Sequence, residues 1–181
     1  MSEGRETLRV GLLQPADAPA YRLLMLEAYT QAADAFTSTA EERAAEPLSF
    51  WERRIADPAG LHFAFGAFVD SRLVGTVALE CNVKPKTRHK ALMIGMYVEP
   101  AARGTGAARQ LVDALIAQAR RRGGLRLLTL TVTEGNGPAI RLYRNAGFVA
   151  FGVEPLAILT PTGYKGKVGM ALDLQRDGEP D

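Results

Sequence analysis

Cysteine and histidine are scarce in this sequence, and long hydrophobic runs are missing. The chain of 181 residues contains one Cys and two His. Cys81 therefore has no partner for an internal disulfide, and we expect it to lie in the core and no metal to be bound. No segment approaches the roughly 20 apolar residues of a transmembrane helix, and the N-terminus lacks the pattern of a signal peptide. We therefore expect a cytoplasmic protein that does not enter a membrane.

An excess of charge of one sign is also missing. The formal net charge is +2, and 47% of the residues are hydrophobic. A nearly balanced globular composition gives no reason to expect a nucleic-acid partner. The length suits one domain, which we place at residues 7–174, between a flexible N-terminus at residues 1–6 and a polar tail at residues 175–181.

Two common nucleotide-binding motifs are excluded. A P-loop needs Gly-Lys followed by Ser or Thr, and the one Gly-Lys pair, Gly166-Lys167, is followed by Val168. The dinucleotide fingerprint needs a third small residue three positions after its second glycine. The stretch that begins at Gly104 and Gly106 has Arg109 there instead, which prevents the close helix–strand contact of that motif.

A loop of small residues between a strand and a helix is the feature that organises the rest. An apolar run at residues 91–98 predicts the strand, and apolar residues at helical spacing predict a helix over residues 106–122. Small residues let backbone N–H groups approach a ligand, and the positive end of a helix dipole favours an anion. We therefore predict an anion cradle formed by Arg103, Gly104, Thr105, Gly106, Ala107 and Ala108.

Hydrophobic periodicity and turn residues give the order of the other elements. The predicted strands cover residues 7–13, 61–69, 73–83, 91–98, 125–133, 148–160 and 168–174. The predicted helices begin near residue 19 and at residues 48, 106 and 138, whereas residues 37–46 read as a loop or an exposed helix. A tight connection at residues 70–72 predicts an antiparallel hairpin, and the 106–122 helix predicts parallel pairing of the strands on either side. The fold class is α/β (α+β), with a mixed sheet of about seven strands and about four helices.

Two separated motifs resemble the GNAT N-acetyltransferase family. The first is Arg103-x-x-Gly106-x-Ala108, directly after a strand that ends in Met96-Tyr97-Val98-x-Pro100. The second runs from Asn136 through Tyr143 to Gly147-Phe148. The resemblance covers about residues 61–174, and the order of the elements fits. It implies a single-domain acyl-CoA N-acyltransferase fold that transfers an acetyl group from acetyl-CoA directly to a primary amine of a small molecule, peptide or protein.

The resemblance also implies which residues bind the donor. The cradle at residues 103–108 would hold the pyrophosphate of acetyl-CoA. The backbone of Met96, Tyr97 and Val98 would pair with the pantetheine arm, and the side chain of Asn136 would contact it. A backbone N–H between two splayed strands would stabilise the oxyanion.

Tyr143 and Glu80 are the predicted catalytic residues. A phenol can protonate a leaving thiolate if the site positions it, and Tyr143 matches the tyrosine of the second motif. Glu80 leads the candidates for the base because carboxylates near this sheet position serve in some relatives. A solvent-facing role for Glu80 is equally compatible with the sequence. Glu99, Glu154, His89 and a water relay remain alternatives.

Other functions and the acceptor stay open. The same loop would suit a non-catalytic acyl-CoA-binding module, and a nucleotide-binding regulator is a third reading. We expect acceptor specificity to depend on the N-terminal helices, residues 37–47 and residues 161–167. Glu41, Glu42 and Glu46 could attract a cationic amine, although an exposed helix face explains them better. The terminal strands could form a homodimer interface.

Overall fold

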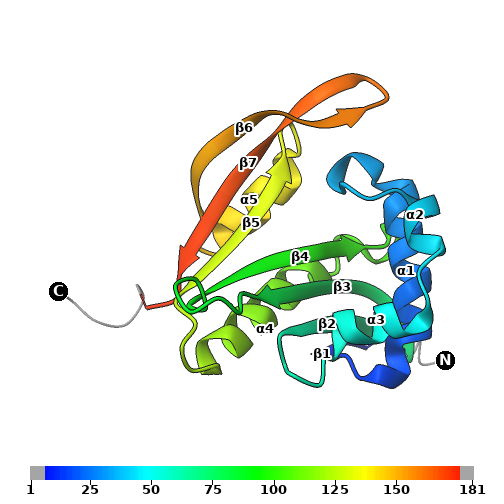
Figure 1. The fold of residues 1–181 in the computed structure, drawn as a ribbon. Coiled ribbons are helices and arrows are strands. Elements are labelled where there is room, and N and C mark those ends of the chain that lie inside the picture. Colours follow the sequence, from blue (N-terminus) through cyan, green and yellow to red (C-terminus); the bar gives the residue numbers. More distant parts are fainter. Residues whose placement is uncertain (1–6, 176–181) are drawn as a thin grey trace.

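Seven strands form one mixed sheet, in agreement with the predicted fold class. A computed structural model describes residues 7–175, and the sheet order is β1-β2-β3-β4-β5-β7-β6. Figure 1 shows the sheet with helices on both sides. The strands are β1 (Leu8–Leu12), β2 (His62–Val69), β3 (Arg72–Cys81), β4 (Lys90–Val98), β5 (Leu127–Thr133), β6 (Val149–Thr160) and β7 (Gly163–Asp173). The predicted N-terminal segment 1–6 and all but the first residue of the predicted tail 175–181 lie outside the described residues.

The pairing of the strands matches the prediction. β2 and β3 form the antiparallel hairpin, and β4 and β5 run parallel. β7 pairs antiparallel with both β5 and β6, so β1 and β6 are the two edge strands. β7 begins five residues earlier than predicted, because the hairpin with β6 extends to the turn at residues 160–163.

The structure has one more α-helix than the four expected. The helices are α1 (Ala18–Gln31), α2 (Ala40–Ala44), α3 (Leu48–Ile55), α4 (Ala107–Arg121) and α5 (Gly137–Asn145), with short 3-10 turns η1 (Pro15–Asp17), η2 (Ala33–Ala35) and η3 (Pro100–Ala102). The extra helix is α2, in the segment that the sequence left open. A reciprocal capping box starts it: Thr39 Oγ1 accepts from the Glu42 amide, and the Glu42 carboxylate accepts from the Thr39 amide.

The helix α4 covers one face of the sheet. Its apolar residues recur at helical spacing, so they form one stripe that the sheet buries. Leu111, Val112 and Leu115 are fully buried among core residues of β2 to β5. Arg122 follows the helix and donates to the Gly60 carbonyl, a contact that joins this end of α4 to the loop before β2.

The helices α1 and α3 cover the opposite face. Trp51 is fully buried, with its ring edge-on to that of Tyr21 at a centroid distance of 5.9 Å. Trp51 therefore belongs to the core between these helices and the sheet. Cys81 is also buried, as expected. Among residues 7–175, none of the helices combines the length and hydrophobicity that a bilayer span requires.

Truncation of Leu111 tests the core under α4. Its side chain is fully buried, so Leu111→Ala removes apolar contacts and leaves a cavity. We expect the free energy of unfolding to fall by about 2–5 kcal/mol. Leu23→Ala is the control, because Leu23 is 67% exposed on α1 and its truncation should change stability by less than about 0.5 kcal/mol. Equal urea midpoints for the two variants would contradict this packing.

Candidate active site

The two central parallel strands diverge after a short paired region. Only Lys90–Leu92 of β4 pair with Leu127–Thr129 of β5. On its other edge β4 contains a bulge, where the register with β3 shifts between Thr76 and Ala78. Gly95 lies in the bulge with φ of 63°, a conformation that glycine adopts without strain. The strands therefore form a wedge, which Figure 1 shows opening toward α1 and α2.

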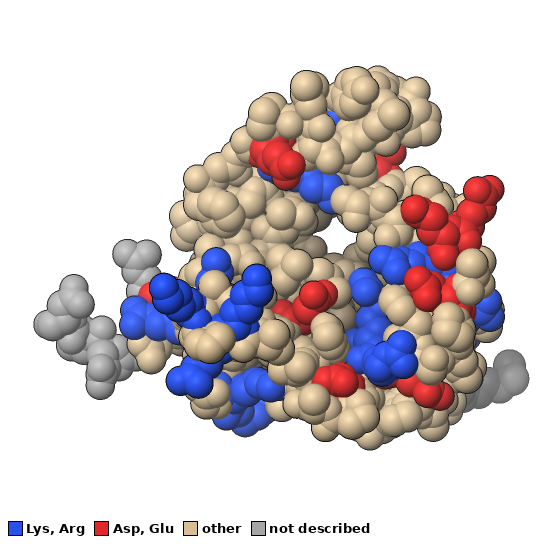
Figure 2. Space-filling model, viewed as in Figure 1, with Lys and Arg blue, Asp and Glu red and all other residues tan. Residues whose placement is uncertain are grey.

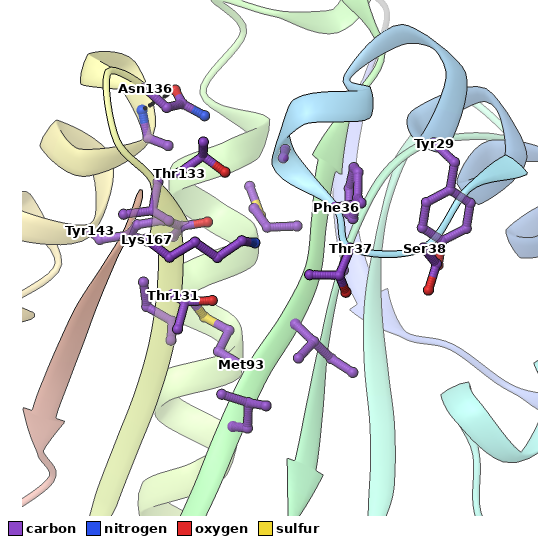
Figure 3. A pocket seen from close by; sticks show the side chains of 18 of the residues that line it. Tyr29, Phe36, Thr37, Ser38, Met93, Thr131, Thr133, Asn136, Tyr143 and Lys167 are labelled. Carbon is purple, nitrogen blue, oxygen red and sulfur yellow. Dashed lines mark hydrogen bonds between the residues drawn. The ribbon is translucent and has the colours of Figure 1, made fainter. Parts of the chain in front are cut away.

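A cavity of about 310 Å³ fills the wedge. One wall comes from β5, α5 and β7, and the labelled side chains there are Thr131, Thr133, Asn136, Tyr143 and Lys167 (Figure 3). The other wall carries Tyr29, Phe36, Thr37 and Ser38, from α1 and the segment after it (Figure 3). Backbone groups of diverging strands have lost their ladder partners, so an extended ligand between the strands could satisfy them.

Asp34 ties the two walls together. Its carbonyl accepts from Thr133 Oγ1 at 2.6 Å, and its carboxylate pairs with Lys165 Nζ at 2.6 Å. Both contacts join η2, in the N-terminal part of the chain, to the C-terminal strands. These two contacts therefore connect the walls of the cavity across the open end of the wedge.

The predicted anion cradle lies where β4 ends. η3 follows the strand, and residues 103–106 lead directly into α4. Gly106 is the N-cap residue of α4 with φ of 88°, and it offers no side-chain cap to the first turn. The amides of that turn are thus left for a ligand. Arg103 is exposed and donates through Nε to the Val98 carbonyl, which orients its guanidinium beside the loop.

The three predicted strand residues differ in the direction of their side chains. Met96 lines the cavity. Tyr97 is buried against α1, and its hydroxyl donates to Glu27 Oε1 at 2.9 Å; burial and this hydrogen bond raise its pKa to about 12. The Val98 carbonyl accepts from Arg103. Tyr97 can therefore contribute to a ligand site only through its backbone, which is the role that we predicted for it.

Asn136 and Tyr143 both line the cavity. Asn136 caps α5, with its side-chain oxygen accepting from the Ala139 amide at 3.2 Å, so its side-chain N–H groups remain as donors. Tyr143 is 7% exposed, and burial raises its pKa to about 12. Its hydroxyl has no hydrogen-bond partner among residues 7–175, so this proton is free to be donated to a ligand.

The predicted carboxylates lie outside the cavity. Glu80 is half-exposed on β3, 4.0 Å from His62 Nε2, and is paired in register with Leu92, which does line the cavity. Glu99 is buried and pairs with Arg72 at 2.6 Å, which holds its charge away from the loop. Within the described residues, no three His, Cys, Asp or Glu side chains come together as metal ligands.

Three cationic residues of the cavity were not predicted as site residues. They are Arg43 of α2, Arg54 of α3 and Lys167 of β7. Lys167 is 8% exposed, and burial lowers its pKa against the opposing effect of Glu154. In sequence these residues lie in three segments without a motif. Their only signal was the expectation that the N-terminal helices, residues 37–47 and residues 161–167 determine acceptor specificity.

A family model and known structures match this chain. The model described as the acetyltransferase (GNAT) family matches residues 25–148. Mycothiol acetyltransferase from Thermomonospora curvata is 38% identical over 98 residues, which cover 54% of this chain and 30% of that protein. The match therefore spans less than a third of that relative's length.

Two solved structures show the same fold. A GCN5-related N-acetyltransferase from Kribbella flavida is 27% identical with a TM-score of 0.79, and the alignment covers 93% of this chain and 98% of that one. An acetyltransferase from Salmonella typhimurium, solved with its cofactor acetyl-CoA, is 22% identical with a TM-score of 0.79, and the alignment covers 97% and 98% of the two chains.

Proposed function

Because the chain belongs to the GNAT acetyltransferase family, we propose that it transfers the acetyl group of acetyl-CoA directly to an amine. The observation that carries the proposal is the wedge between β4 and β5. An anion cradle lies at its open end, and a buried phenol with a free hydroxyl lies inside it. The cradle suits the pyrophosphate of the donor, and the phenol suits its leaving thiolate.

The loop at residues 103–108 would hold the pyrophosphate. Uncapped amides at the start of α4 offer hydrogen bonds, and the dipole of a 15-residue helix favours negative charge there. Arg103 would add a charged hydrogen bond. The pantetheine arm would extend along Met96, Tyr97 and Val98 as an additional strand, with a side-chain N–H of Asn136 as a further donor.

The proposed reaction consists of nucleophilic attack, cleavage of the C–S bond and two proton transfers. The amine nitrogen attacks the thioester carbonyl carbon, and the carbonyl oxygen becomes an oxyanion. A backbone N–H of the diverging β4 would stabilise this oxyanion, a contribution of about 3 kcal/mol by comparison with other oxyanion donors. The C–S bond then breaks, the thiolate takes the proton of Tyr143, and the amine loses a proton to a base. The products are an amide and CoA.

Glu80 remains our proposal for that base. Its register partner Leu92 lines the cavity, so a water molecule between Glu80 and the amine would relay the proton. Glu99 is less suitable because Arg72 already pairs with it. His89 is exposed in the β3–β4 loop, and Glu154 lies on the edge strand β6, so both remain weaker alternatives.

Gly106→Glu tests the donor site. The substitution puts a side chain at a positive φ and a negative charge where the pyrophosphate would bind, so we expect CoA affinity to fall by at least about 100-fold. Isothermal titration with CoA gives the measurement. Gly123→Glu is the matched control, because Gly123 lies at the other end of α4 in open space and should leave affinity unchanged. Wild-type affinity in Gly106→Glu would remove the loop from the donor site.

Tyr143→Phe tests the acid. The raised pKa keeps the phenol protonated at neutral pH, and the substitution removes only its hydroxyl. We expect kcat to fall by about 10²-fold or more while CoA affinity is nearly unchanged. Tyr164→Phe is the control, because Tyr164 is 65% exposed and outside the cavity. Unchanged turnover in Tyr143→Phe would reject the assignment.

The alternative function is a non-catalytic acyl-CoA-binding module. Such a module has no need of a phenol in the wedge, so the free hydroxyl of Tyr143 favours catalysis. Release of free thiol from acetyl-CoA with a panel of amines separates the two functions. Binding of CoA without turnover of any amine would favour the binding module. A cytoplasmic location, where acetyl-CoA is available, stays a prediction.

A homodimer through the edge strand β6 is part of the proposal. Large apolar side chains on this strand are more than half exposed, namely Val149, Phe151, Val153, Leu156 and Leu159. An apolar edge strand invites pairing with another strand. We expect Leu159→Glu to lower the sedimentation coefficient from that of a dimer to that of a monomer. Val83→Glu, at an equally exposed loop residue, should have no such effect. A monomeric wild-type protein would exclude the dimer.

A further inference from the structure

The cavity in the wedge is lined by cationic side chains and by no carboxylate. Of its 21 lining residues, Arg43, Arg54 and Lys167 carry positive charge, and none is Asp or Glu. A pocket that recognised a cationic amine by charge alone would need carboxylates in its lining. Glu41 and Glu42 are instead exposed on α2 outside the cavity, and Glu46 pairs with Arg43. The charge of the cavity therefore favours an acceptor that is itself anionic.

The cations are poorly compensated within the described part of the protein. Lys167 is nine-tenths buried, and its side chain points into the cavity without a hydrogen bond or ion pair among residues 7–175 (Figure 3). The Nε atoms of Arg43 and Arg54 are buried without a partner. Arg43 has one ion pair, to Glu46 at 3.7 Å. Arg54 has no ion pair among those residues, and burial is opposed there chiefly by the phenol of Tyr21, with Glu80 as a weaker contribution, so that the pKa of Arg54 is raised. Burying charge without a counter-ion is costly, and an anionic ligand would offset that cost.

The two arginines are positioned on the same side of the cavity. Both guanidinium groups lie over the ring of Phe50, at 5.0 Å for Arg43 and 5.9 Å for Arg54. A single guanidinium group can bind a carboxylate with two parallel N–H donors, so either arginine suits a planar anion. Figure 2 shows Lys and Arg side chains gathered beside the hollow between the β5–β7 region and the α1–α3 side.

The pyrophosphate of the donor does not account for these cations. None of the loop residues 103–108 lines the cavity, and Arg43 and Arg54 come from α2 and α3, across the wedge from β5 and α5. The cavity volume of about 310 Å³ is at the lower end for ligand pockets, and the pantetheine end of the donor would fill part of it, so the acceptor is small.

We propose that the acceptor is a small amine that carries a carboxylate, of the size of an amino acid, and that Arg43 and Arg54 bind this carboxylate. The inference rests on the proposed acetyl transfer and specifies its substrate class. Lys167, on the opposite wall, adds positive charge near the amine. Positive charge disfavours the ammonium form, so the cavity itself would ease loss of the amine proton before attack.

Pairs of acceptors that differ only in the carboxylate test whether the enzyme recognises that group. Each L-amino acid is compared with its own carboxamide as acceptor, with acetyl-CoA as donor and thiol release as the readout. We expect kcat/KM for at least one amino acid to exceed that of its carboxamide by about 10- to 100-fold, the range for hydrogen bonds between charged groups. The carboxamide has the less basic amine and therefore the larger fraction of unprotonated amine at neutral pH, so a preference for the carboxylate does not come from the supply of free amine. Carboxamides that react as well as the amino acids would overturn the proposal.

Arg54→Gln links the preference to the named site. In this variant we expect the ratio of kcat/KM for the amino acid to kcat/KM for its carboxamide to fall to within about threefold of one, because the charged hydrogen bond to the carboxylate is lost. Arg53→Gln is the matched control, because Arg53 is the exposed neighbour on α3 and does not line the cavity, so the preference should persist. If Arg54→Gln fails to fold by circular dichroism, Arg43→Gln carries the same readout. A preference that survives both Arg43→Gln and Arg54→Gln would overturn the assignment.

A binding experiment separates failure of this inference from failure of acetyl transfer. The probes are an N-acetyl-L-amino acid and its carboxamide, titrated into the CoA-loaded protein. Trp51 is the single tryptophan of the chain and lies three residues before Arg54 on α3, so its fluorescence is the reporter. Tighter binding of the carboxylate, lost in Arg54→Gln and kept in Arg53→Gln, supports the anion site even if no amine is turned over. Equal binding of the two probes would overturn it.

Discussion

The structure depends on the separation of β4 from β5. Parallel strands in a central position would normally pair along their whole length, and here three residues of each strand pair. The bulge at Gly95 keeps β4 attached to β3 while bending it away from β5. Beyond the paired residues, the backbone groups on the two facing edges lack ladder partners, while β4 stays paired with β3 and β5 with β7. The loop at residues 103–108, the buried phenol of Tyr143 and the cationic wall are all arranged around this one interruption of the sheet.

Local patterns were sufficient for much of the fold. Turn residues and hydrophobic periodicity predicted the seven strands, the hairpin of β2 and β3, and the helix α4 within a residue at each end. They left α2 undecided, because a five-residue helix has too few turns to show a period. The sequence feature that indicates this helix is its capping box, formed by Thr39 and Glu42.

The residues of the candidate site could be predicted only in part, because some of them come together only in the folded chain. The loop at residues 103–108 and the residues Asn136 and Tyr143 belong to contiguous motifs, so the sequence could indicate them. Arg43, Arg54 and Lys167 become neighbours only when α2, α3 and β7 are placed around the wedge. The sequence predicted the strand that contains Glu80. It could not predict whether the Glu80 side chain reaches the cavity, because that depends on how the sheet bends.

The contacts of Asp34 have a consequence for how the protein is made. They join residues 99 and 131 positions apart in the chain. Contacts of such long sequence separation cost much chain entropy and tend to form late in folding. During synthesis, the cavity cannot be closed until β7 has left the ribosome and paired with β5. An incomplete chain would therefore have the loop at residues 103–108 but not the enclosed cavity.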